Sequence, residues 1–191
     1  MKELIEKIKN SISLSIQAEE YLYTISKERN FLKGETLIRE GQTVKKTYFV
    51  TDGCLRSYCT DKNGKEHTLQ FAIKDWWISD FIAIYNNELA TLTVECITDC
   101  KVIEFNAKEL EEIYTKFPEF EAFQRRNLER HVVSSHKRIL NQMQLTAPER
   151  YELFLNQYPD IEQYIPNYHI ASYLGITQQS LSRIRVERAK K

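Results

Sequence analysis

The chain shows three successive patterns of hydrophobic and polar positions. Residues 2 to about 27 carry apolar side chains at helical spacing, which predicts two helices, the second capped by Ser15. From Phe31 to Phe105 the pattern changes to short runs typical of β-strands, at residues 35–39, 46–50, 54–60, 65–72, 92–98 and 101–105. Four of the five glycines separate these runs, and many short strands between turns predict a barrel or jelly roll.

After Phe105 the apolar spacing becomes helical again. Asn106 and Glu109 form a capping box, which predicts a short helix ending near Pro118. A longer helix is predicted at 119–143, a stretch with neither Gly nor Pro. A helix of this length usually joins two domains or two subunits, and a surface helix packed along the barrel is the alternative.

The C-terminal segment carries the most specific pattern. Thr146 and Glu149 form a second capping box, which opens a helix to about Gln157. Residues 167–191 then read as two helices broken at Gly175, a residue that can adopt positive φ in a tight turn. The small Ala171 permits close approach of the second helix, and these features together predict a helix-turn-helix.

The second helix of such a motif enters the DNA major groove with its N-terminal residues facing the bases. Gln can bind adenine through two hydrogen bonds and Arg can bind guanine, so the exposed side chains suit direct readout. The predicted DNA-binding residues are Thr177, Gln178, Gln179, Ser182, Arg183 and Arg185. Residues 167–191 contain five basic side chains and one acid, a net charge of +4, whereas a merely solvated two-helix corner would mix both signs.

The sequence resembles the cyclic-AMP-receptor and FNR (Crp/Fnr) family of bacterial transcription regulators. Residues 31–35 with Gly41 match the opening of the family's cyclic-nucleotide-binding β-roll, residues 48–56 match its next strands, and residues 63–66 match its hairpin. Family members carry Glu-x-x-Ser-Arg on the recognition helix, where this chain has Gln179-Ser180-Leu181-Ser182-Arg183. The change from Glu to Gln alters the base preference, because Gln both donates and accepts.

The resemblance implies an α+β fold with three parts. These are a sensor β-roll with N-terminal helices at 1–118, a dimerisation helix at 119–143 and a helix-turn-helix domain at 144–191. It implies a homodimer that binds a two-fold symmetric site on double-stranded DNA, with RNA polymerase as a further candidate partner. A sensor or protein-interaction module that does not use DNA is the alternative function.

The resemblance also places a nucleotide cassette, in which a Glu takes the ribose hydroxyl and an Arg takes the cyclic phosphate. The corresponding pairs here are Ser79-Asp80 and Ala90-Thr91, and with Trp77 they form the candidate effector pocket. Ala90 offers the phosphate neither charge nor donor, which argues against cyclic-AMP binding in the usual way. The aromatic residues Trp76, Trp77 and Phe81 either fill this pocket, which is the favoured interpretation, or line a site for a flatter ligand.

The cysteines and histidines of the sequence do not have the spacing of a metal site or of an enzyme active site. FNR-like members hold an iron-sulfur cluster with N-terminal cysteines, but this chain has none before Cys54 and no CxxC, so four buried or half-buried thiols are predicted. A cupin-like metalloenzyme needs converging histidines, and only His67 lies in the strand region. We therefore predict neither a metal site nor an enzyme.

Composition limits the class of protein but does not indicate a function. The 191 residues include 27 basic and 27 acidic side chains, so the +4 of residues 167–191 leaves the other 166 residues at −4. The longest apolar run, residues 81–85, is far shorter than the about twenty residues of a membrane-spanning helix. The N-terminus also lacks the hydrophobic stretch of a signal peptide, and a cytoplasmic location is expected.

Overall fold

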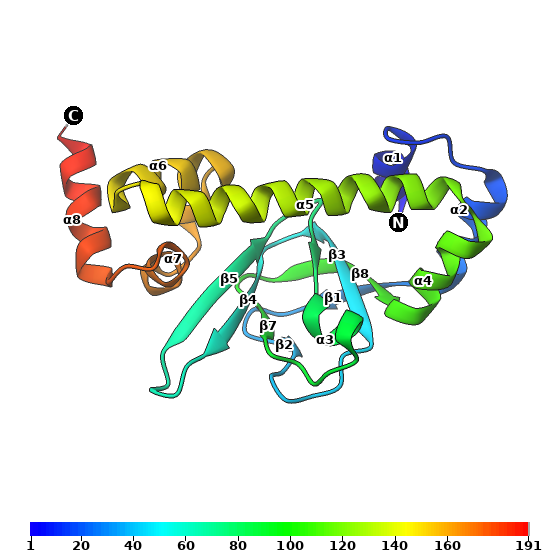
Figure 1. Ribbon diagram of the computed structural model, residues 1–191, viewed down its shortest axis with the longest axis horizontal. Coiled ribbons are helices and arrows are strands. Elements are labelled where there is room, and N and C mark those ends of the chain that lie inside the picture. The colour runs from blue at the N-terminus through cyan, green and yellow to red at the C-terminus, as the bar shows by residue number, and fades with distance from the viewer. Residues whose placement is uncertain (191) are drawn as a thin grey trace. The chain divides into compact units, whose positions relative to one another are not determined.

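The computed structural model describes residues 1–190, which divide into two compact units. The first unit contains residues 1–59 and 70–129, and the second contains residues 60–69 and 130 onward. Figure 1 shows the elements in chain order, coloured from the N-terminus to the C-terminus. The long helix α5 (Glu119–Gln144) contributes to both units, and so do two neighbouring strands.

Eight strands form two sheets of four. The first sheet has the order β1-β8-β3-β6, with β1 at Ser26–Phe31, β8 at Cys100–Asn106, β3 at Lys46–Asp52 and β6 at Trp77–Ile78. The second has the order β2-β7-β4-β5, with β2 at Thr36–Ile38, β7 at Thr93–Cys96, β4 at Leu55–Thr60 and β5 at Glu66–Ala72. The predicted β-roll is thereby confirmed, although β1 and β6 had no counterpart in the predicted strands.

Two hydrophobic cores lie on opposite faces of the first sheet. Successive residues of a strand point to opposite faces, so Tyr48 and Val50 of β3 join the core shared with the second sheet, whereas Phe49 joins the other core. On β8, Val102 and Ile103 divide in the same way. The central strands of this sheet are therefore buried on both faces.

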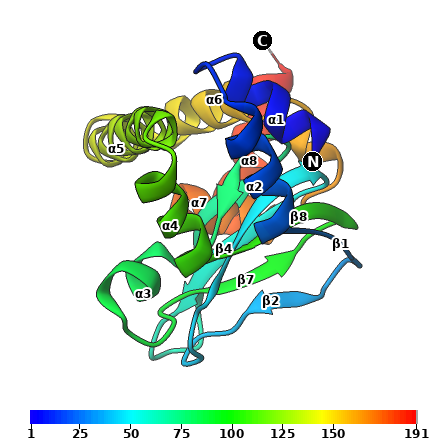
Figure 2. The same ribbon diagram turned by 90° about the vertical axis from the view of Figure 1, so that its right-hand side faces the viewer.

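Helices cover the outer face of the first sheet. Helices α1 (Lys2–Lys9) and α2 (Ile16–Ile25) bury apolar residues there, together with α4 (Ala107–Lys116) and the start of α5. Figure 2 shows α1 and α2 above the strands. Ser15 caps α2 as predicted, its hydroxyl accepting from the amide of Ala18 at 3.3 Å. A further helix, α3 (Phe81–Asn86), lies between β6 and β7.

Besides the end of α5 and the β4–β5 hairpin tip, the second unit contains short helices around a small aromatic core. Helices α6 (Ala147–Gln157), α7 (Asn167–Leu174) and α8 (Gln178–Ala189) are joined by turns and by a 3-10 helix, η1 (Ile161–Gln163). The rings of Phe154, Tyr158 and Tyr173 contact one another at centroid distances of 5.2 to 5.9 Å. At the start of α6, Glu149 accepts from the amide and hydroxyl of Thr146 at 2.8 and 2.7 Å.

The β4–β5 hairpin tip belongs to the second unit. The hydroxyl of Ser172 on α7 donates to the Glu66 carbonyl at 2.7 Å and accepts from the Thr68 amide at 2.8 Å. One hydroxyl thus contacts both a donor and an acceptor of β5. The hairpin backbone is consequently tied to the first helix of the predicted helix-turn-helix.

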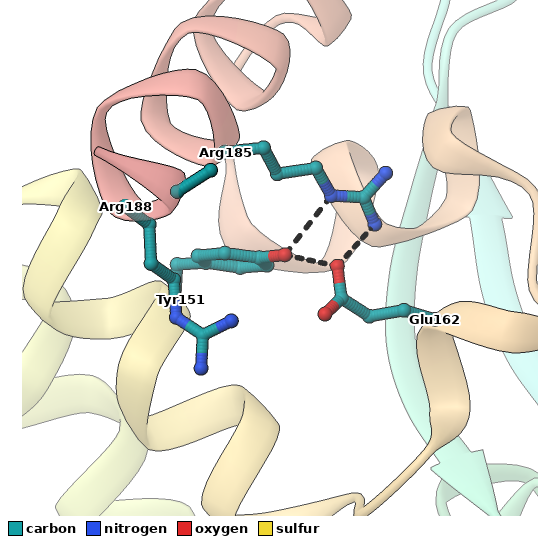
Figure 3. A pocket seen from close by; sticks show the side chains of 5 residues that line it. Tyr151, Glu162, Arg185 and Arg188 are labelled. Atoms are coloured by element: carbon teal, nitrogen blue, oxygen red, sulfur yellow. Dashed lines mark hydrogen bonds and ion pairs between the residues drawn. The ribbon is translucent and has the colours of Figure 1, made fainter. Parts of the chain in front are cut away.

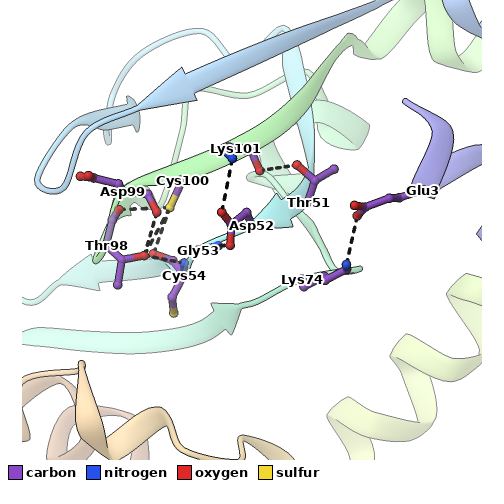
Figure 4. Close-up of polar contacts among 10 residues, drawn as sticks. All are labelled: Glu3, Thr51, Asp52, Gly53, Cys54, Lys74, Thr98, Asp99, Cys100 and Lys101. Atoms are coloured by element: carbon purple, nitrogen blue, oxygen red, sulfur yellow. Dashed lines mark hydrogen bonds and ion pairs between the residues drawn. The ribbon is translucent and has the colours of Figure 1, made fainter.

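The turn between β3 and β4 packs tightly against the turn between β7 and β8. The Cys54 amide donates to the Thr98 hydroxyl at 2.9 Å, and the Cys100 thiol lies 3.4 Å from the Cys54 carbonyl (Figure 4). Gly53 has a φ of +87°, and a Cβ built there would lie 2.2 Å from the Asp99 carbonyl oxygen. Only glycine satisfies both the backbone angle and the close approach.

Replacing Gly53 with alanine should destabilise the first unit by about 2 to 4 kcal/mol, because left-handed strain adds to a backbone clash. Gly34→Ala is the matched control, since Gly34 has a φ of +86° with no atom within 4 Å of the added Cβ. The control should lose about 1 kcal/mol. Urea unfolding of both variants measures the difference, and equal losses would show that the turn–turn contact does not constrain Gly53.

Candidate nucleic-acid interface

The α7–α8 segment has the turn geometry that the sequence predicts. Gly175 ends α7 in the left-handed conformation, with a φ of +68°, and the Ile176 amide donates to the Ala171 carbonyl at 3.0 Å. Thr177 then caps α8, its hydroxyl accepting from the Ser180 amide at 3.1 Å. Thr177 therefore sets where the helix begins, and its side chain is occupied by that role.

Two apolar side chains hold α8 on the rest of the unit. Leu181 and Ile184 are its buried residues, and they lie three positions apart on one side of the helix. On α7, Ala171 and Leu174 are buried where the two helices pack together. This arrangement leaves the opposite side of α8 free to face solvent.

The N-terminal half of α8 presents four predicted site residues on its exposed surface. Their side chains make no hydrogen bond or ion pair within residues 1–190, and they are Gln178, Gln179, Ser182 and Arg183. No acidic side chain occurs on α8 before Glu187. The structure thus brings together amide, hydroxyl and guanidinium groups that can bind an external partner.

Arg185 lies differently from the other predicted site residues. Its side chain is only 27% exposed, and its guanidinium forms an ion pair with Glu162 at 2.6 Å. It also donates to Tyr151 Oη at 2.9 Å and to the Asn167 side chain. Figure 3 shows Arg185, Tyr151 and Glu162 pointing toward one another in a pocket of about 430 Å³.

The candidate effector residues occupy the first unit, where Asp80 is fully buried. One Asp80 oxygen caps α3 by accepting from the Ala83 amide at 3.0 Å. The other accepts from the Thr91 amide at 2.6 Å, the Thr91 hydroxyl at 3.0 Å and the Leu92 amide at 2.9 Å. Asp80 and Thr91, both assigned to the candidate effector pocket, therefore lie in contact. Both Asp80 oxygens, however, already accept hydrogen bonds from the chain itself.

The other candidate effector residues point elsewhere. The Ser79 hydroxyl donates to the Lys46 carbonyl at 2.7 Å. Trp77 packs on Phe49 and Phe105, at ring distances of 5.3 and 5.4 Å, in the core between the first sheet and the helices. Ala90 is buried among the strands instead. Trp77 thus lies in a core on the opposite face of the sheet from Ala90, so it neither fills nor lines a pocket beside Ala90.

The cysteines are free thiols, three of them buried and Cys59 partly exposed. This matches the predicted burial. Burial raises the pKa of the Cys54 thiol, which keeps it protonated. Within residues 1–190 no cluster of three or more His, Cys, Asp or Glu side chains has the arrangement of a metal site, and no helix there is long and apolar enough to span a membrane.

The comparisons with known proteins agree on one family. A family model described as a cyclic nucleotide-binding domain matches residues 28–117. The transcriptional activator protein FnrA of Stutzerimonas stutzeri is 24% identical over 188 residues, which cover 91% of this chain and 75% of that protein. The chain is thus similar to transcription regulators of the Crp/Fnr family.

Solved structures show the same Crp/Fnr fold. A protein from Eubacterium rectale, assigned to the crp/fnr family of transcriptional regulators, superposes with a TM-score of 0.73 at 17% identity, covering 93% of this chain and 85% of that one. The c-di-GMP-responsive global regulator CLP of Xanthomonas campestris has a TM-score of 0.71 at 12% identity, covering 92% of each chain. At these identities the likeness establishes the fold.

The sequence does not predict the partners of Arg185. The available signal was helical spacing, because Arg185 lies four residues after Leu181 and next to Ile184, on the buried side of α8. Its partners come from three separate elements, and no motif in the sequence connects them. The hairpin contact with Ser172 was missed for the same reason.

Proposed function

We propose that this chain is a homodimeric, sequence-specific DNA-binding transcription regulator that does not respond to cyclic AMP in the usual way. Regulators of the Crp/Fnr family bind DNA and act as dimers. The observation that carries the proposal is the exposed, unoccupied surface of α8 formed by Gln178, Gln179, Ser182 and Arg183. Such a surface at the N-terminal half of a recognition helix suits the major groove.

The chemistry of these side chains indicates how bases are read. Arg183 can donate two parallel hydrogen bonds to guanine O6 and N7, and Gln178 or Gln179 can bind adenine N6 and N7. The Ser182 hydroxyl suits a base edge or a phosphate. Lys190 is exposed at the C-terminal end of α8 and supports non-specific attraction to phosphates.

The dimer would form along α5. Four exposed apolar side chains fall on one stripe of this helix at 3.6 residues per turn, and they are Leu128, Val132, Ile139 and Met143. Met143 is 77% exposed, which is costly for an apolar residue unless a partner covers it. A second copy of α5 presents a self-complementary stripe, as a two-fold symmetric dimer requires. Two α8 helices would then read half-sites about one DNA turn apart.

The absence of a usual cyclic-AMP response is supported by the Asp80 contacts. A ribose hydroxyl would have to displace the donors of Thr91 or Leu92, which would leave buried amides without an acceptor. Ala90 supplies no cation to a cyclic phosphate, and losing such a contact costs roughly 1.5 to 3 kcal/mol. Internal hydrogen bonds from Thr91 and Leu92 thus occupy the Asp80 oxygen that would accept from a ribose hydroxyl.

Arg183→Ala should reduce affinity for the selected site by about 1 to 3 kcal/mol and relax the preference at one guanine, because the bidentate contact is lost. The site is obtained by selecting bound duplexes from a random pool with the wild-type protein. Lys190→Ala is the control and should weaken selected and random DNA equally, with a flatter salt dependence. Equal weakening of both DNAs by Arg183→Ala would contradict base reading, and no enriched motif would favour a protein-interaction module.

Val132→Glu combined with Ile139→Glu should convert the dimer to a monomer, because two charges would be buried at the contact. The molar mass in solution, measured by light scattering after gel filtration, reports the change. Lys137→Glu on the same helix is the control, since Lys137 is exposed away from the stripe and its replacement should leave the dimer intact. A double-Glu variant that stays dimeric would place the interface elsewhere.

Calorimetric titration with cyclic AMP should show no saturable binding in the micromolar range, since neither the acceptor nor the cation of the cassette is available. The DNA affinity of the wild-type protein should also be unchanged when cyclic AMP is added. A fitted micromolar Kd, or a nucleotide-dependent gain in DNA affinity, would show that the Asp80 contacts open for the ligand.

A further inference from the structure

One guanidinium links α8 to the three other elements that surround it. Arg185 ion-pairs with Glu162 of η1 at 2.6 Å, donates to Tyr151 of α6 at 2.9 Å and donates to Asn167, the first residue of α7. The Tyr151 hydroxyl in turn donates to Glu162. We call these four residues the Arg185 cluster. Figure 3 shows its dashed contacts meeting at Glu162 and at the Tyr151 hydroxyl.

Tyr151 serves the Arg185 cluster as a neutral group. Burial and the hydrogen bond to Glu162 raise the pKa of Tyr151, so its hydroxyl remains a neutral donor at ordinary pH. Arg185 has a planar fork of donors: its Nε and Nη2 face Tyr151 and Glu162, and its Nη1 faces Asn167. Glu162 and Asn167 supply acceptors in return. A point charge such as Lys could not make the same set of contacts.

The apolar contacts of α8 do not by themselves set its rotation. Leu181 and Ile184 are its only buried side chains within residues 178–190, and apolar packing is not directional. After Ile184 the remaining contacts that tie down α8 are polar. They comprise the Arg185 cluster and the pair Arg188–Glu152, in which both side chains are 51% exposed.

A small rotation of α8 would matter for base reading. Side-chain tips lie about 5 to 6 Å from a helix axis, so a rotation of about 10° moves them by about 1 Å. A displacement of that size takes a bidentate hydrogen bond out of its favourable geometry. Arg185 lies two residues after Arg183 on the same turn, where it can resist such a rotation most directly.

We propose that Arg185 is a positioning residue, which sets the rotation of α8 through its cluster and thereby the base specificity of Arg183 and its neighbours. The role presupposes the DNA-reading function proposed above. It differs from the direct DNA contact that the sequence predicts for Arg185. The two roles predict opposite effects of changing Glu162.

If Arg185 were a phosphate contact, Glu162 would compete with DNA for it. Glu162→Gln would then free the guanidinium, remove a negative charge and strengthen binding to every duplex. As a positioning residue, Arg185 needs the Glu162 carboxylate. Glu162→Gln should therefore weaken binding to the selected site about tenfold, while binding to random DNA stays the same or increases.

The experiment measures affinity for the selected site and for random DNA in Glu162→Gln, Arg185→Gln and the double variant. Each single change should lower the ratio of the two affinities about tenfold, and the double variant should lose no more than either single one, because both remove one shared contact. Arg185→Lys should keep part of the ratio. Urea unfolding of each variant separates lost fold from lost specificity.

The Arg188–Glu152 pair provides a matched control one turn further along α8. Arg188→Gln and Glu152→Gln should leave the ratio of affinities unchanged, because exposed pairs contribute little to structure. Stronger binding of Glu162→Gln to the selected site, or reduced stability with an unchanged ratio, would overturn the positioning role. A wild-type protein that selects no motif would instead overturn the proposed function, and the role with it.

Discussion

The double burial of strands β3 and β8 is the constraint on which the first unit depends. Phe49 packs toward the helices while Tyr48 and Val50 pack toward the second sheet, so the strand pair joins two cores at once. A change of one residue in the β3–β8 register would exchange the two faces and misplace every side chain. The tight turn at Gly53 follows β3 directly, after an irregularity in the β3–β8 register between Val50 and Asp52.

A second polar constraint in the first unit is the buried carboxylate of Asp80. Asp80 joins the start of α3 to the strand-side residues Thr91 and Leu92, and both of its oxygens accept from the chain itself. A polar group that would otherwise need a ligand or water is thereby satisfied internally. Asp80 therefore serves the first unit as a structural link between α3 and the residues that precede β7.

In the second unit, one side of α8 carries the residues of the proposed DNA contact and the other side holds the helix in place. One side of α8 presents exposed amide, hydroxyl and guanidinium groups, and the other side holds the helix through Leu181, Ile184 and Arg185. Base reading requires hydrogen bonds of fixed direction, and the directional contacts of Arg185 hold α8 in the orientation that such bonds need. Under the proposed function, specificity would depend on the side chains that hold α8 as well as on those that it exposes.

The sequence by itself determined the elements that depend on local signals. The capping box of Thr146 and Glu149, the Asn106 cap, the turn at Gly175 and the helical stripe of residues 119–143 are encoded by neighbouring residues, as is the exposed surface of α8. Only the tertiary structure decided the polar edge strand β1, whose residues pair with β8, and the inward turn of Arg185 toward Glu162. The pairing of β1 and the contact of Arg185 both depend on residues distant in the chain, and a local sequence pattern does not identify such partners.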